Sequence, residues 1–221
     1  MFKKILAIGD SFTYGEELDD IYLAWPYQIA RSLGAQVVNL GEPGSGNRRM
    51  VRKIMDHVTD NPDTDLVLIG WSSPGRTEFA DMEGVYSIWP GYSCKLFTRD
   101  EQLWRVELLE HLNKHHDPAY MFEQYLVDVI LTQSFLKTKK IKYLMCNVSG
   151  NEYYHKIMTN KFNNLRSEID QEYFVGWPNT GMTEWAFKCR KGKYGHFLEE
   201  GHFRVADELL NAMGKFGWIK Y

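Results

Sequence analysis

The sequence is poor in cysteine, and this shortage excludes a fold held together by a disulfide framework. Only three of its 221 residues are cysteines, Cys94, Cys146 and Cys189, an odd number at wide and irregular spacing. Such a set fits reduced thiols better than a disulfide framework or a zinc site. We therefore expect a cytoplasmic protein that holds no metal.

Long apolar runs and an excess of positive charge are also missing. The apolar run at residues 5–8 is followed closely by Asp10 and is far too short for the core of a signal peptide. No other run approaches the length of a membrane span. The 26 Lys and Arg residues face 29 Asp and Glu, which gives a net charge of -3. Because nucleic acids and anionic membranes bind clustered positive charge, we expect neither as a partner.

The remaining composition is typical of a soluble globular protein, with 44% hydrophobic and 25% charged residues. Strand-like apolar runs alternate with amphipathic helical patterns. The strand-like runs are residues 3–9, 35–40, 65–70 and 141–148, with a weaker fifth at 172–177. The helical patterns are residues 24–33, 47–58, 119–138 and 199–214, and Gly34 would end the first of them. This alternation predicts a parallel sheet with helices on both faces.

Two segments are longer than a simple crossover between strands requires, residues 75–118 and 149–195. We expect a single domain over residues 1–221 that carries these segments as insertions, because its length suits one core better than two. Long insertions often form lids or binding loops. The amphipathic stretch LWRVELLEHL predicts that residues 75–118 form a mainly helical cover beside the cleft.

Small and polar residues follow the strands at the ends where ligands bind in an open parallel sheet. Candidate substrate contacts at this edge are Asp10, Asn47, Trp71 and Arg76. Ser11 also lies there, and a serine needs a base to become a nucleophile. His196 would lie in the loop before the last helix, whereas His202 would lie inside that helix and is expected to be structural.

Three sequence blocks resemble those of the SGNH, or GDSL-type, hydrolases. The G-D-S block is matched by residues 9–11, and the block N-x-G/A-x-P/S-G-x-S-N by residues 39–47. The last block, H-P-x-x-x-G-H followed by a helix, reads here as residues 196–202, HFLEEGH. The blocks occur in the right order, so the resemblance spans essentially the whole chain apart from the two insertions.

The resemblance implies a fold and a set of roles. The fold would be a three-layer α/β/α sandwich whose five-stranded parallel sheet has the flavodoxin-like order 2-1-3-4-5. Ser11 would be the nucleophile and His196 the base. The backbone N–H groups of Ser11 and Gly44 would stabilise the oxyanion.

The third block of the family, G-x-N-D, is not matched. Pro74 occupies the position of its Asn, which would be a further oxyanion donor. Ser73 could donate a hydroxyl instead, or Arg76 a charged group. A structural role for Arg76, paired with an acid, is equally open.

The acid of the usual Ser-His-acid triad is missing as well. It lies two or three residues before the histidine in the family, where this chain has Tyr194 and Lys193. Three arrangements stay open: a Ser–His pair oriented by a backbone carbonyl, an acid from elsewhere such as Glu184 or Glu199, or a binder without catalysis.

The resemblance implies a serine esterase, lipase-like or a carbohydrate deacetylase. It would cleave a small or carbohydrate-linked ester through an acyl-enzyme on Ser11 and would need no cofactor. Acyl transfer by the same residues and a non-catalytic binding protein on the same scaffold are the alternatives.

Overall fold

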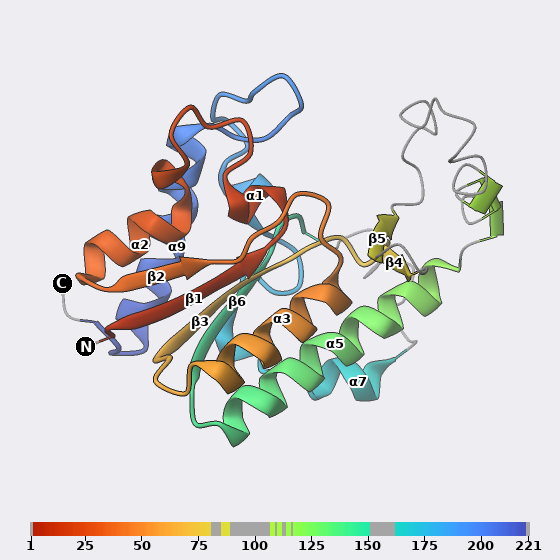
Figure 1. Ribbon diagram of the computed structural model, residues 1–221, viewed down its shortest axis with the longest axis horizontal. Coiled ribbons are helices and arrows are strands. Elements are labelled where there is room, and N and C mark those ends of the chain that lie inside the picture. The colour runs from red at the N-terminus through yellow and green to blue at the C-terminus, as the bar shows by residue number, and fades with distance from the viewer. Residues whose placement is uncertain are drawn as a thin grey trace.

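A five-stranded parallel sheet forms the centre of the molecule in the computed structural model (Figure 1). The structure describes residues 2–80, 85–88, 107–108, 110–111, 114–115, 117–150 and 162–219. The strands are β1 (Lys4–Gly9), β2 (Gln36–Asn39), β3 (Leu66–Trp71), β6 (Lys142–Asn147) and β7 (Phe174–Val175). They pair in the order β2-β1-β3-β6-β7, each parallel to its neighbours. The predicted sheet and its strand order are therefore confirmed.

Two pairs of helices cover the two faces of this sheet (Figure 1). One face packs on α2 (Trp25–Leu33) and α9 (Glu199–Lys215), and the other on α3 (Asn47–Asp60) and α5 (Pro118–Thr138). All four helices lie close to their predicted bounds. Gly34 ends α2 in the left-handed conformation, with φ 62°, as its position in the sequence indicated.

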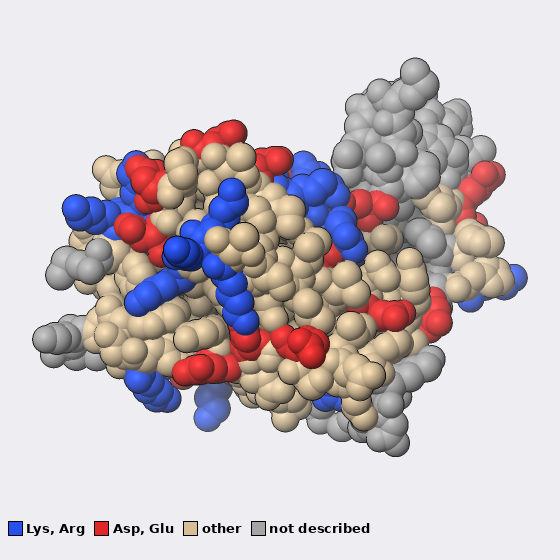
Figure 2. Space-filling view, turned by 90° about the horizontal axis from the view of Figure 1, so that it is seen from below, with Lys and Arg blue, Asp and Glu red and all other residues tan. Residues whose placement is uncertain are grey.

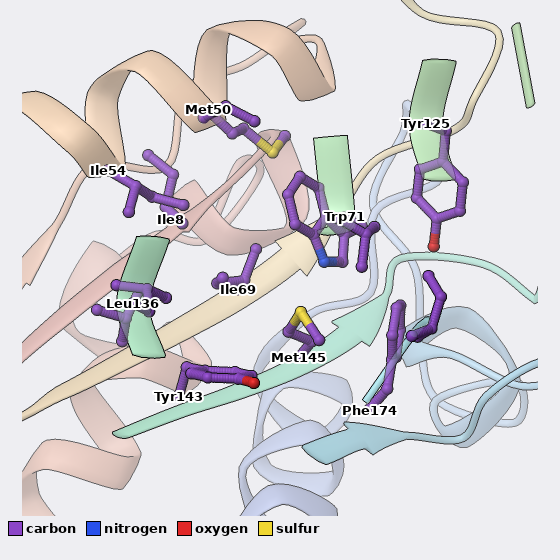
Figure 3. Close-up of a cluster of buried hydrophobic side chains, with 14 of the residues drawn as sticks. Ile8, Met50, Ile54, Ile69, Trp71, Tyr125, Leu136, Tyr143, Met145 and Phe174 are labelled. Carbon is purple, nitrogen blue, oxygen red and sulfur yellow. The ribbon is translucent and has the colours of Figure 1, made fainter. Parts of the chain in front are cut away.

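The core between the sheet and the helices α3 and α5 includes Trp71 (Figure 3). The Trp71 ring is fully buried and meets the ring of Tyr125 edge to face at 6.2 Å. Burying a large apolar side chain stabilises a fold by about 1.5–3 kcal/mol. The proposed substrate contact of Trp71 is therefore wrong, because its side chain turns from the strand into the core.

The first long insertion starts with strands. β4 (Thr77–Ala80) and β5 (Val85–Ile88) form an antiparallel pair beside α3. The prediction of a mainly helical segment is thus wrong for this part, where Thr, Val, Ile and aromatic residues favour strands. Within the amphipathic stretch 103–112, residues 107–108 and 110–111 are described and are helical, as predicted, and the others lie outside the described residues.

Shorter elements complete the described chain. They are α1 (Ser11–Tyr14) and η1 (Ile21–Leu23) after β1, and α7 (Asn163–Ser167), η4 (Gln171–Tyr173) and α8 (Met182–Trp185) in the second insertion. Positive and negative side chains are interspersed among the described residues on the face shown in Figure 2. None of the described helices combines the length and the apolar character that crossing a membrane requires.

Candidate active site

Ser11 lies at the carboxyl end of β1, the central position that the sequence predicted for it. The strand ends at Gly9, and Asp10 caps α1 by accepting a hydrogen bond from the Phe12 N–H at 3.1 Å. Ser11 is therefore the first residue of a short helix, and its amide is not used by an earlier turn. The helix ends at Gly15 with φ 95°, where the chain reverses direction.

His196 reaches Ser11 from the loop before α9. Its Nε2 lies 2.9 Å from Ser11 Oγ, which is hydrogen-bonding distance. The ring also packs against Phe12, with centroids 4.7 Å apart. Within the loop, Gly192 N–H donates a hydrogen bond to the His196 carbonyl at 2.8 Å. The backbones of Lys191 and Phe197 pair as in an antiparallel sheet. The loop and Phe12 together fix the ring beside the serine.

Glu17 lies on the other side of the His196 ring. Its Oε2 is 2.9 Å from His196 Nδ1 and accepts a hydrogen bond from the His196 backbone N–H at 3.1 Å. Its Oε1 accepts a hydrogen bond from Tyr194 N–H at 2.8 Å. Partial desolvation works to raise the pKa of Glu17, but the hydrogen bonds from Tyr194 and His196 outweigh it and lower the pKa. Glu17 is thus held as a carboxylate.

An acid from elsewhere in the chain contacts His196 Nδ1, but it is neither of the two glutamates named from the sequence. Glu184 does not approach His196, because its Oε2 accepts hydrogen bonds from Gly150 and Gly181 N–H at 2.7 Å each. Glu199 lies in the first turn of α9 and makes no contact with His196 among the described residues. A backbone carbonyl is not the partner of Nδ1 either. Sequence reasoning missed Glu17, whose only signal was that it closely follows the G-D-S block.

A second acid, Glu16, approaches the same ring from the side of Ser11. Its Oε2 lies 3.5 Å from His196 Nε2, and its side chain is 39% exposed. At that distance and exposure the two groups interact weakly. Of the two glutamates, Glu17 is the one that is ordered by several hydrogen bonds.

Of the predicted oxyanion donors, Gly44 has a backbone that is open to close approach. Gly44 has φ 79°, a conformation that favours glycine, and a Cβ there would meet no atom within 4 Å. The space above its backbone is therefore open. Ser73 Oγ accepts a hydrogen bond from Gly75 N–H at 3.3 Å in the turn after β3. The donor roles of Ser11, Gly44 and Ser73 stay predictions.

Asp10 and Asn47 hold the loops of the site together and do not offer their side chains to a substrate. Asp10 is 1% exposed, and its Oδ2 accepts hydrogen bonds from Ser72 Oγ at 2.7 Å and Arg76 Nη1 at 3.1 Å. Asn47 is 3% exposed and bonds the backbone of Ser72 in both directions, at 2.9 and 3.2 Å. Their proposed substrate contacts are corrected, because buried polar groups that are already paired have little capacity left.

A pocket of about 430 Å³ lies behind Arg76, between the start of α3, the loop after β3 and the first half of α5. Its charged lining consists of Arg48, Arg52, Arg76, Glu78 and Asp128. Arg48 Nε lies 2.8 Å from Asp128, and Arg52 Nη2 lies 2.7 Å from Glu78. Burial raises the pKa of Asp128 to about 6, although Arg48 works against that shift.

His202 has the structural position that the sequence predicted. It is 1% exposed, and its Nδ1 accepts a hydrogen bond from Trp25 N–H at 3.2 Å, at the start of α2. Desolvation, with a smaller effect of His196, lowers the pKa of His202 to about 3. The ring is therefore neutral and serves as a cap for α2.

Solved structures with this fold include several esterases. TesA matches with a TM-score of 0.61 at 12% identity, over 96% of this chain and 99% of TesA. The esterase EstA from Pseudoalteromonas sp., in a structure inhibited by monoethylphosphonate, gives 0.60 at 10% identity, over 98% and 100%. An acetylxylan esterase from Geobacillus stearothermophilus gives 0.56 at 16% identity, over 99% and 97%. The fold is that of the SGNH, or GDSL-type, hydrolases.

By sequence, the chain belongs to a family of unknown function, DUF6071, whose match covers residues 15–167. The matched range includes Glu17 but neither Ser11 nor His196. No curated protein matches the sequence. At the low identities above, the solved structures establish the fold alone, so the chemistry has to be argued from the site.

Proposed function

We propose that the protein is a serine esterase that uses Ser11 as nucleophile and His196 as base. The observation that carries this proposal is the 2.9 Å approach of His196 Nε2 to Ser11 Oγ at the carboxyl edge of the sheet. A general base needs this distance to the proton that it abstracts. A protein that only binds a ligand has no need of such a pair, so the geometry supports catalysis over binding.

The proposed reaction has two halves. Ser11 Oγ attacks the ester carbonyl carbon while His196 Nε2 takes its proton, and the carbonyl oxygen becomes an oxyanion near the N–H groups of Ser11 and Gly44. As the carbon–oxygen bond breaks, the same proton passes to the leaving alcohol and the acyl group stays on Ser11. A water molecule, deprotonated by His196, then attacks the acyl-enzyme. The acid is released, and Ser11 regains its proton.

The pocket behind Arg76 supports a polyhydroxylated alcohol as one part of the substrate. Each arginine of the lining is paired with a carboxylate: Arg48 with Asp128, Arg52 with Glu78, and Arg76 with Asp10, which is buried and does not itself line the pocket. Phosphate groups would meet the carboxylates, and amines would meet the guanidinium groups. Hydroxyl groups both donate and accept hydrogen bonds, so they match a lining of mixed donors and acceptors. Acetylated sugars are therefore the substrates we propose first.

Hydrolysis of model esters tests this function. We expect the wild type to release acetate from p-nitrophenyl acetate and from acetylated xylose. Ser11→Ala and His196→Ala should each lower kcat by about 1000-fold or more. Ser32→Ala is the matched control, because Ser32 Oγ is exposed on α2 and, among the described residues, bonds the Gln28 carbonyl alone. Full activity of Ser11→Ala, or no activity of the wild type on any ester, would contradict the proposal. Added xylose that captures the acetyl group would identify acyl transfer.

A further inference from the structure

The loop that follows the nucleophile carries the carboxylate that orients His196. We propose that Glu17 is the positioning residue of the site and replaces the acid that related enzymes place before the histidine. This inference rests on the proposed esterase function and concerns the same site. It gives the nucleophile and the acid to one short stretch of chain, residues 11–17, into which the loop of His196 inserts from the far end of the sequence.

The contacts of Glu17 fix both the orientation and the tautomer of the His196 ring. Oε2 lies 2.9 Å from Nδ1, while Nε2 on the opposite side of the ring lies 2.9 Å from Ser11 Oγ. An ionised carboxylate only accepts hydrogen bonds, so Nδ1 carries the proton. Nε2 is then the unprotonated nitrogen that faces Ser11. The negative charge also stabilises the imidazolium that forms when the ring takes the serine proton.

Glu17 is itself held in a built site. Tyr194 N–H and His196 N–H each donate a hydrogen bond to it, at 2.8 and 3.1 Å. Its side chain is 11% exposed, and its backbone has φ 70°, which is uncommon for a residue with a side chain. Backbone strain of this kind concentrates at functional sites. A carboxylate that only decorated the surface would not require it.

Gly192 makes room for this carboxylate. A Cβ at position 192 would lie 2.5 Å from Cδ and from Oε1 of Glu17, so a larger residue there would force the Glu17 carboxylate to shift. The backbone of Gly192 does not have a positive φ, so close packing and not conformation requires the glycine here. The histidine loop thus fits around the Glu17 side chain, and its shape depends on that fit.

Three variants at position 17 and a control test the inference. Glu17→Gln is expected to lower kcat on p-nitrophenyl acetate by about 10⁴-fold with little change in KM, and Glu17→Ala to a similar extent. Glu17→Asp keeps the charge and should retain more activity than Glu17→Gln. In Glu17→Gln the acid limb of the pH–rate profile should move to lower pH, because the imidazolium loses the charge of Glu17 at 2.9 Å and keeps only the more distant and exposed Glu16 at 3.5 Å. Glu199→Gln should match the wild type.

A double-mutant cycle separates positioning from general damage. Gly192→Ala should lower kcat by pushing Glu17 away from the ring. Combined with Glu17→Gln, it should add little further loss, because both changes remove the same interaction. Thermal unfolding of each variant identifies any that fail to fold. If Glu17→Gln does not fold, the kcat values of Glu17→Asp and Gly192→Ala still test the role of Glu17.

The results separate this inference from the proposed function. If the wild type neither hydrolyses esters nor reacts with a serine-directed probe, the proposed function fails. If the wild type is active but Glu17→Gln keeps its kcat and its pH profile, the role of Glu17 is overturned and the function stands. Strictly additive losses in Gly192→Ala and Glu17→Gln would also contradict the inference.

Discussion

His196 and His202 are close in sequence but have opposite environments. His196 lies in a loop between Ser11 and Glu17, where both ring nitrogens contact polar groups. His202 is buried in α9, where its Nδ1 caps α2 and its Nε2 has no hydrogen-bond partner among the described residues. One ring is therefore placed to exchange protons, and the other to stay neutral.

Replacing His202 should affect stability and not chemistry. We expect His202→Ala to lower the free energy of unfolding by about 2–4 kcal/mol, because it removes a helix cap and leaves a cavity. Urea unfolding measures this loss. The ester hydrolysis rate, measured well below the unfolding midpoint, should stay near that of the wild type. A catalytic loss without a stability loss would reverse the roles of the two histidines.

We also expect His202 to make the stability of the fold depend on pH. The pKa of His202 is lowered to about 3 from its usual value of 6.5, so between these values the unfolded chain binds a proton that the folded chain does not. Stability should therefore fall as the pH falls from about 6.5 to 3, by up to about 1.4 kcal/mol per pH unit. His202→Asn keeps an acceptor near Trp25 N–H, and its free energy of unfolding, measured by urea titration, should fall less steeply over this pH range. Equal slopes in the wild type and the variant would contradict this prediction.

At the residue scale, the sequence predicted the groups that belong to local blocks. Ser11 and His196 each lie inside a recognisable pattern, and the structure brings the two side chains together. Glu17 lies outside every pattern, and its role depends on a contact across 179 positions of sequence. Trp71 was misjudged because a strand end does not reveal which way its side chain turns.

At the scale of elements, the pocket joins the first turns of α3 to α5 and the loop after β3. Some arginines of α3 line the pocket and others do not, so substituting one of each kind compares the two locations. Arg52 lines the pocket and pairs with Glu78, whereas Arg49 pairs with Glu42 at 2.7 Å and lies outside it. Each arginine pairs with one glutamate, but Glu42 also pairs with Lys53 and is more exposed than Glu78.

Substitution of these arginines tests the polyhydroxylated substrate. Arg52→Met should raise KM for acetylated xylose by about fivefold, close to 1 kcal/mol, and leave KM for p-nitrophenyl acetate nearly unchanged. Arg49→Met should change neither value. Steady-state kinetics on both esters gives the comparison. Equal effects of the two substitutions would exclude the pocket as the sugar site.

Helices and strands were predictable to different degrees for physical reasons. The helices α2, α3, α5 and α9 have apolar faces that repeat with the helical period, and their ends were found closely. The short strands β4 and β5 were missed, because four-residue strands carry little periodic signal. β7 was found only as a weak run, and in the structure it is two residues long.

At the scale of the whole molecule, alternating buried runs and amphipathic helices were enough to predict the sheet and its layers. The strand order came from the resemblance to the SGNH hydrolases that the sequence blocks carry. The two departures from the family pattern could not be resolved in that way. For the acid, the contact between Glu17 and His196 joins two loops and depends on the assembled fold.

The central claim is that Ser11 is a nucleophile activated by His196, and covalent labelling tests it most directly. The protein would be incubated with a fluorophosphonate, whose phosphorus loses fluoride to an attacking serine oxygen, and then analysed by intact-mass and peptide mass spectrometry. We predict one adduct per chain, located on the peptide that contains Ser11, absent from Ser11→Ala and formed much more slowly in His196→Ala. Wild-type protein without an adduct, or an adduct that persists in Ser11→Ala, would contradict the account.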